Sequence, residues 1–170
     1  MLLVLVRHGA TIAGAGCCVG QADVPLAPEG AAEMAELARR WNLRQIAEPS
    51  RIIMSDLSRA VQSAGPFVER FGIEAERDAR LREMSFGAWD GLDWNAIERD
   101  DALQFRRWAE RWTELAPPGG ETVADLSARA RAFLDEMRAA YAASDDTVLV
   151  VSHAGWIRAA LAALFDEPAS

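Results

Sequence analysis

Short apolar runs alternate along this chain with longer segments in which apolar residues recur at helical spacing. The runs at residues 2–6, 51–55 and 147–151 are rich in branched aliphatic side chains and predict strands, and a short further strand is expected at residues 73–76. Residues 2–6 show no alternation of apolar and polar side chains. This pattern favours a central strand of a parallel sheet that is buried on both faces.

Helical periodicity fills the segments that follow the first two strands. Residues 28–41 open with Pro28, which suits the first turn of a helix. Residues 57–71 repeat the pattern, and we expect Pro66 to kink this helix and Gly72 to end it. Each of these helices connects one predicted strand to the next.

The second half of the chain contains three more predicted helices. They cover residues 93–115, which hold several tryptophans, residues 122–141 and residues 155–164. Thr122, followed three residues later by Asp125, resembles a capping box that opens the second of these helices.

Strand and helix patterns therefore alternate along the chain, apart from residues 81–91, which have no clean period and predict an ordered loop. This alternation predicts an α/β fold, a three-layer α/β/α sandwich around a mainly parallel central sheet. The chain has 170 residues, of which 51% are hydrophobic, so we expect residues 1–170 to form a single domain.

Charge and composition narrow the range of partners. The net charge of −8 disfavours nucleic-acid binding, because the surface as a whole repels polyanions. No apolar stretch is long enough to span a membrane, and the apolar run before Arg7 is too short for a signal peptide, so we expect a cytoplasmic protein. The adjacent Cys17 and Cys18 lack the spacing of a zinc site, and no metal site is expected. The oligomeric state stays open.

The candidate chemistry gathers around the only two histidines of the chain, His8 and His153. Each lies just beyond the carboxyl end of a predicted strand. Ligands of open α/β sheets bind outside these strand ends, so the two imidazoles can converge on one pocket. Arg7, Arg59 and Glu83 fall in neighbouring loops or helix starts. Two guanidinium groups can hold a phosphate bidentately, and backbone N–H groups at helix starts can add donors. These residues predict an anion site in which side chains supply the positive charge.

Six motifs occur in the order typical of one known family. The first contains Arg7-His8-Gly9. The motifs span residues 5–11, 20–30, 55–60, 81–91, 119–122 and 151–155. On these residues the chain resembles the histidine phosphatase superfamily, also called phosphoglycerate-mutase-like. The resemblance spans nearly the whole chain.

The resemblance implies a role for each residue of the anion site. His8 would be the nucleophile that accepts the phosphoryl group, and Arg7 and Arg59 would hold phosphate oxygens. His153 would donate to a phosphate oxygen. Glu83 would protonate the leaving oxygen and then activate the water that hydrolyses phosphohistidine. Attack requires a neutral His8 ring whose other nitrogen has its proton fixed by an acceptor.

The resemblance also implies a substrate class. It predicts a metal-independent phosphomonoesterase without a cofactor, acting on a small-molecule phosphomonoester, with Thr11, Gln21 and Thr122 as further substrate contacts. The tryptophans beside the expected pocket indicate an aromatic or bulky leaving group. Residues 16–26 are most similar to the branch of α-ribazole phosphatases, which act late in cobalamin synthesis.

Three departures from the family pattern leave other functions open. Ala10 and Gly14 stand where the family often has glutamate and asparagine, and the chain ends soon after Leu164, where relatives usually continue into another strand. Two explanations are open: either an edge strand is absent, or the tail has been lost. The alternatives are a phosphoglycerate-mutase-type phosphotransferase and a catalytically weak module that binds a phospho-ligand.

Overall fold

The computed structural model describes residues 1–165, without the side chains of residues 43 and 44. Its centre is a four-stranded sheet in the order β1-β6-β3-β4, and all three neighbouring pairs are parallel. The strands are β1 (Leu2–Arg7), β3 (Arg51–Met54), β4 (Ala75–Arg77) and β6 (Thr147–Ser152). The predicted mainly parallel sheet is confirmed, with β4 beginning two residues later than the sequence pattern indicated.

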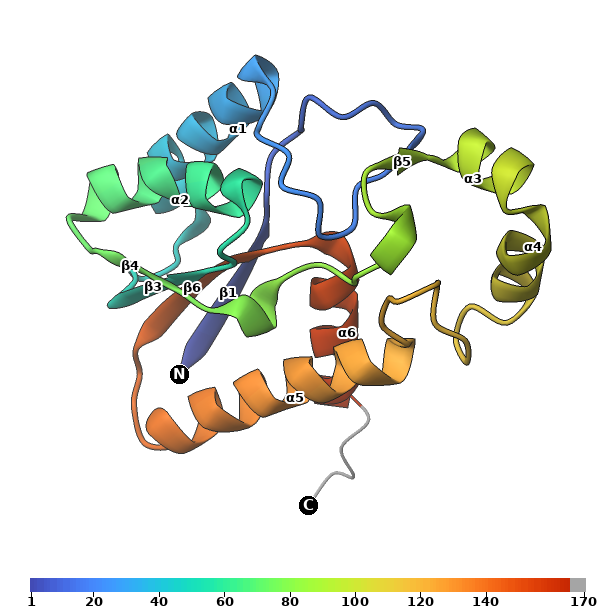
Figure 1. Ribbon diagram of the computed structural model, residues 1–170. Coiled ribbons are helices and arrows are strands. Elements are labelled where there is room, and N and C mark those ends of the chain that lie inside the picture. Colours follow the sequence, from blue (N-terminus) through green and yellow to red (C-terminus); the bar gives the residue numbers. More distant parts are fainter. Residues whose placement is uncertain (166–170) are drawn as a thin grey trace.

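Helices cover both faces of this sheet (Figure 1). One face carries α1 (Pro28–Arg39) and α2 (Ser58–Phe71), and the other carries α5 (Val123–Ala140) and α6 (Ala154–Phe165). Alternate residues of β6 pack into the two cores, with Leu149 and Val151 on the first face and Val148 and Val150 on the second. The three-layer α/β/α arrangement is therefore confirmed.

The position of β1 differs from the prediction. It lies at one edge of the sheet among the described residues, and β6 takes the central place with every residue buried. Leu3 and Leu5 pack against one helix layer and Val4 and Val6 against the other. Both faces of β1 are thus covered, which explains its lack of alternation. An apolar run indicates that both faces of a strand are covered by other elements. It does not distinguish a central strand from an edge strand.

The predicted helix at residues 93–115 is in fact two short helices, α3 (Trp94–Asp100) and α4 (Ala102–Glu110), separated at Asp101. The rings of Trp94 and Trp108 stack with centroids 5.9 Å apart. A straight helix would separate these two residues by about 21 Å along its axis, so the chain must turn back to bring the rings together. Burial of the aromatic side chains therefore overrides the continuous helical pattern.

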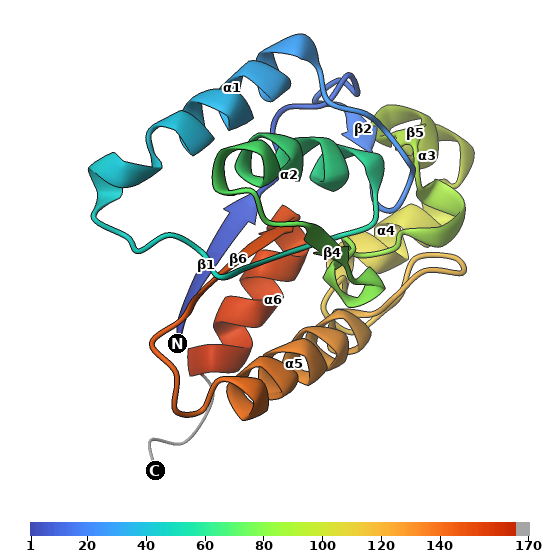
Figure 2. The same ribbon diagram turned by 90° about the vertical axis from the view of Figure 1, so that its left-hand side faces the viewer.

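Several short elements lie outside the sequence prediction. The pair β2 (Cys17–Cys18) and β5 (Leu92–Asp93) is antiparallel. Residues 1–165 also contain three 3₁₀ helices: η1 (Trp41–Arg44), η2 (Ala79–Leu81) and η3 (Gly87–Trp89). Elements of a few residues have no recognisable period. Figures 1 and 2 both show α3, α4 and β5 grouped on one side of the molecule.

Two helix signals read from the sequence are confirmed. Thr122 and Asp125 form the capping box at the start of α5, and α2 continues through Pro66 to a left-handed Gly72. Across residues 1–165, no helix is long and apolar enough to cross a bilayer.

Candidate active site

The candidate site lies where three parallel strands end. His8, Ser55 and His153 directly follow β1, β3 and β6. Backbone hydrogen bonds join the strand ends: His8 N–H donates to the carbonyl of Ser152 at 2.9 Å, and Ser55 N–H donates to that of Val151 at 2.9 Å. The ring centroids of His8 and His153 are consequently only 5.0 Å apart. The convergence expected from the strand positions is present.

His8 has the protonation state that nucleophilic attack requires. Its Nδ1 lies 2.7 Å from the carbonyl oxygen of Gly9, which can only accept, so Nδ1 carries the proton and Nε2 keeps its lone pair. Burial lowers the pKa of His8 to about 4, the Gly9 hydrogen bond opposes this shift, and the positive charges of Arg59 and Arg7 add to it. The ring is therefore neutral at pH 7.

The loop that carries His8 is held by close backbone packing. A Cβ atom on Gly9 would lie 2.5 Å from the carbonyl oxygen of Gly30 in α1, so no larger residue fits without a shift. The N–H of Gly9 donates to Ser63 Oγ at 3.1 Å, and that hydroxyl donates to the carbonyl of Arg59 at 2.7 Å. The loop that carries His8 and α2 are thereby connected.

Arg59 projects from the first turn of α2 and is 1% exposed. Its Nη1 donates to the carbonyl of Ala22 at 2.8 Å, its Nη2 to that of Gly20 at 2.6 Å, and its Nε to His153 Nδ1 at 3.2 Å. These contacts use three of the five N–H donors of a guanidinium, so the group is fixed in orientation and still has donors for a bound anion.

His153 is fully buried at 0% exposure. Because Arg59 can only donate, Nδ1 is the acceptor and the proton of the neutral ring sits on Nε2, 2.8 Å from Ser55 Oγ. Burial, followed by the charge of Arg59, lowers the pKa of His153 to about 2. Both ring nitrogens thus face protein groups, whereas the resemblance implied that one donates to phosphate.

Glu83 approaches the same region from the loop after η2. Its carboxylate accepts from the N–H of Met84 at 3.0 Å and from the N–H of Gly155, in the first turn of α6, at 3.1 Å. Its own carbonyl accepts from Gln21 Nε2 at 2.9 Å and from Arg129 Nη2 at 2.9 Å. Gln21, expected as a substrate contact, therefore holds the loop of Glu83.

A pocket of about 790 Å³ opens over these groups. Five of the predicted catalytic and substrate-binding residues line it: Arg7, His8, Thr11, Arg59 and Glu83. Thr122 is engaged elsewhere, since its hydroxyl accepts from the N–H of Asp125 at 3.1 Å and caps α5. The structure thus brings most of the expected anion site together around one cavity.

Comparison with known proteins identifies the family. The profile of the histidine phosphatase superfamily (branch 1) matches residues 3–170. The chain belongs to the histidine phosphatase superfamily. It is 36% identical to the glucosyl-3-phosphoglycerate phosphatase of Mycobacterium tuberculosis, over 98% of this chain and 76% of that protein. It is 31% identical to the adenosylcobalamin/alpha-ribazole phosphatase of Salmonella typhimurium, over 100% of this chain and 82% of that protein.

A solved structure agrees with this assignment. The alpha-ribazole phosphatase from Shigella flexneri matches with a TM-score of 0.88 and 27% identity, covering 99% of this chain and 81% of that one. The protein is a phosphatase of this superfamily, as its named relatives are.

The wall of the phosphatase pocket beyond its basic floor is largely apolar. Arg7 and Arg59 are the only arginines or lysines that line it within the described part of the chain, and Glu33 of α1 adds a carboxylate. Phe86 and Trp94 supply aromatic surface. The remaining lining includes small apolar residues and both cysteines: Ala10, Ala13, Ala15, Cys17, Cys18 and Val19.

The cysteines of this wall are free. Burial and the nearby Asp90 carboxylate raise the pKa of Cys18 to about 12, so its thiol stays protonated and unreactive at neutral pH. Across residues 1–165, no three His, Cys, Asp or Glu residues cluster in a way that could hold a metal ion.

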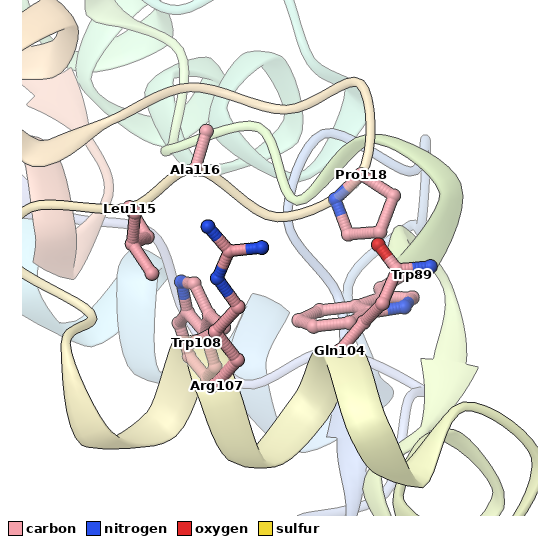
Figure 3. A pocket seen from close by; sticks show the side chains of 7 residues that line it. All are labelled: Trp89, Gln104, Arg107, Trp108, Leu115, Ala116 and Pro118. Atoms are coloured by element: carbon pink, nitrogen blue, oxygen red, sulfur yellow. The ribbon is translucent and has the colours of Figure 1, made fainter.

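A second, smaller cavity of about 240 Å³ lies against α4 (Figure 3). Arg107 and Gln104 rise from the helix towards Ala116 and Pro118, and Trp108 lies at its base. None of the predicted catalytic or substrate-binding residues lines it, whereas two of the tryptophans noted in the sequence, Trp89 and Trp108, do. Trp108 connects this cavity with the main pocket, because its ring stacks on Trp94 and packs edge-on against Phe86.

Sequence reasoning missed three residues that hold the site together: Ser55, Glu121 and Arg129. Ser55 and Glu121 lie inside two of the family motifs, at residues 55–60 and 119–122, so their place in a motif could have indicated a role in the site. Arg129 is one of several arginines in α5, and nothing in the sequence distinguishes it.

Proposed function

We propose that this protein is a metal-independent phosphomonoesterase that works through a phosphohistidine on His8. The observation that carries the proposal is the state of that ring: a neutral imidazole, with Nδ1–H held by the Gly9 carbonyl and Nε2 available, beside the buried Arg59 guanidinium. In phosphoryl transfer the protein mainly positions groups and stabilises charge, which the fixed guanidinium of Arg59 can do together with that of Arg7.

In the first step the phosphate of the substrate is held by Arg7 and Arg59. His8 Nε2 attacks phosphorus while the bond to the leaving oxygen breaks, and the carboxyl group of Glu83 gives its proton to that oxygen. The products are phosphohistidine, a free alcohol and a Glu83 carboxylate. In the second step this carboxylate takes a proton from water, the water oxygen attacks phosphorus, and the N–P bond breaks to release inorganic phosphate.

His153 has two parts in this scheme. It fixes the orientation of Arg59 through Nδ1, and when the phosphoryl group is bound the Ser55 hydroxyl rotates away and a phosphate oxygen takes its place as the acceptor of the Nε2 proton. The 5.0 Å separation of the two imidazole rings supports this exchange, because a phosphoryl group on His8 lies within reach of His153. The loss of the Ser55 contact is then compensated by a bond to a charged oxygen.

For the natural substrate we favour a phosphomonoester with an uncharged, partly aromatic leaving group, with α-ribazole phosphate as the leading candidate. The support is the wall formed by Phe86 and Trp94 and the carboxylate of Glu33, which favour an uncharged group over a carboxylate. The relative from Mycobacterium tuberculosis makes glucosyl-3-phosphoglycerate the second candidate. The carboxylate of its glycerate part would have to share Arg7 or Arg59 with the phosphate.

The nucleophile is tested by comparing the wild-type protein with His8→Ala in excess chelator. We expect the wild type to hydrolyse p-nitrophenyl phosphate and to retain radiolabelled phosphate on His8 after rapid quenching, and we expect the variant to do neither. Undiminished hydrolysis by His8→Ala would refute the mechanism. Binding of phosphate by a wild type that never turns over would favour the phospho-ligand module.

The substrate is tested by kcat/KM ratios, since specificity is a difference in transition-state binding. We expect α-ribazole phosphate to exceed glucosyl-3-phosphoglycerate and phosphoglycerates by about tenfold or more, the size of one lost polar or charge contact. A reversed order would transfer the assignment to the second candidate. Exchange of phosphate between phosphoglycerate isomers faster than its release would indicate a mutase.

A further inference from the structure

We propose that Arg129 and Glu121 are positioning residues that brace the backbone on both sides of Glu83 and so aim its carboxyl group at the leaving oxygen. This inference rests on the proposed role of Glu83 as the proton donor. Neither residue lines the pocket, so both act through Glu83 and not on the substrate.

Arg129 is saturated by contacts with the segment that leads into Glu83. Its Nη1 donates to the carbonyls of Arg80 at 2.8 Å and Arg82 at 2.7 Å, and its Nη2 donates to that of Glu83 at 2.9 Å. Its Nε and Nη2 also donate to the two carboxylate oxygens of Glu121 at 2.8 and 2.9 Å. All five N–H donors of the guanidinium are therefore used.

Glu121 holds the chain on the other side of Glu83. Its carboxylate accepts from the N–H of Ser85 at 2.8 Å, and its own N–H donates to the carbonyl of Ser85 at 2.9 Å. The side chains of Arg129 and Glu121 are only 17% and 23% exposed, so solvent screens these contacts weakly. Residues 80–85 are thereby attached to the start of α5 through one ion pair.

The balance of charge explains why Arg129 is paired with Glu121. A lone guanidinium would place an uncompensated positive charge close to Glu83. The carboxylate of Glu121 neutralises Arg129 while leaving its other donors for three backbone carbonyls. The pair thus supplies rigidity without bringing net charge to the proton donor.

If Arg129 and Glu121 position the proton donor, their loss should have a specific effect on the kinetics. Proton donation matters greatly when the leaving group is a basic alkoxide and little when it is a stabilised phenolate. The ratio of kcat/KM for benzyl phosphate to kcat/KM for p-nitrophenyl phosphate therefore measures how well the carboxyl group of Glu83 is oriented towards the leaving oxygen. Both substrates have an aromatic ring, and the ratio does not depend on the fraction of folded enzyme.

The experiment measures this ratio for the wild type and for Arg129→Gln, Arg129→Lys, Glu121→Gln and Glu83→Gln. General acid catalysis contributes about 100- to 10,000-fold, so we expect Glu83→Gln to lower the ratio most and the brace variants to lower it by about tenfold or more. Arg129→Lys keeps the charge but cannot reach all five acceptors, and we expect it to behave like Arg129→Gln. If Arg129→Gln does not fold, Glu121→Gln carries the test.

Arg99→Gln is the matched control, because Arg99 forms an ion pair with Asp100 in which both side chains are more than half exposed. We expect the wild-type ratio for it. A wild-type ratio in the brace variants, together with a lowered ratio in Glu83→Gln, would overturn the brace alone. A wild-type ratio in Glu83→Gln would overturn the proposed role of Glu83 and the brace with it.

Discussion

At the scale of single residues, backbone groups decide how the two central side chains of the site act. The carbonyl of Gly9 fixes the proton of His8 on Nδ1, and the N–H of Gly155 anchors the carboxylate of Glu83. An imidazole side chain exchanges between two tautomers in water, and a carboxylate rotates freely. The missing side chain at Gly155 lets the backbone approach Glu83 closely, and at Gly9 it lets the His8 loop pack against Gly30.

Gly155→Ala should therefore displace Glu83, the proposed proton donor. A Cβ atom at this position would lie 2.2 Å from Glu83 Oε1, so the carboxylate must move away from the Gly155 N–H. We expect kcat/KM for benzyl phosphate to fall by about tenfold or more, with a smaller loss for p-nitrophenyl phosphate, since only the first needs full proton donation.

The control for this substitution is Gly65→Ala in α2, where a Cβ atom would meet nothing within 4 Å. We expect it to leave both rate constants unchanged and to raise the free energy of unfolding by about 0.5–1 kcal/mol, because alanine is the better helix former. Equal losses for both substrates in Gly155→Ala would contradict a displaced proton donor.

At the scale of elements, the ends of the helices hold the catalytic loops in place. The start of α5 carries its capping box directly after Glu121, which braces Ser85. The start of α6 presents the N–H of Gly155 to Glu83. Loops without regular structure are thus given fixed positions by helix termini whose N–H groups need partners in any case.

Thr122→Ala tests whether this residue serves the helix or the substrate. Loss of the cap should lower the free energy of unfolding by about 1 kcal/mol, measured by urea denaturation. We expect KM for p-nitrophenyl phosphate to stay unchanged, because the hydroxyl of Thr122 is engaged with Asp125. Thr122→Ser keeps the hydroxyl and should restore stability. A raised KM with unchanged stability would instead make Thr122 a substrate contact, as the family resemblance implied.

At the scale of the whole molecule, folding buries two histidines next to arginines. The pKa is lowered to about 4 for His8 and to about 2 for His153, from an ordinary value of 6.5. The unfolded chain therefore binds more protons than the folded one as the pH falls below 6.5. The two histidines therefore leave the free energy of unfolding at its full value above about pH 6.5. They lower it progressively as the pH falls from 6.5 towards their folded-state pKa values.

Urea denaturation at pH 7 and pH 5 measures this loss. We expect each histidine to lower the free energy of unfolding by about 2 kcal/mol between the two pH values. His8→Asn should remove the part that belongs to His8, and carboxylates titrate in both proteins, so the difference isolates this residue. An identical pH dependence in wild type and variant would show that His8 titrates normally in the folded state.

Patterns along the chain are sufficient to predict the order of the main strands and helices, the family, and the residues at the strand ends that form the pocket. These follow from local periodicity and from motifs with a characteristic spacing. Folding, in contrast, places β1 at an edge of the described sheet, turns residues 93–115 back as two helices, and brings Arg129 and Gln21 to the carbonyl of Glu83. Each of these depends on which surfaces and donors meet after folding, and helical or strand periodicity carries no information about partners that are distant in sequence.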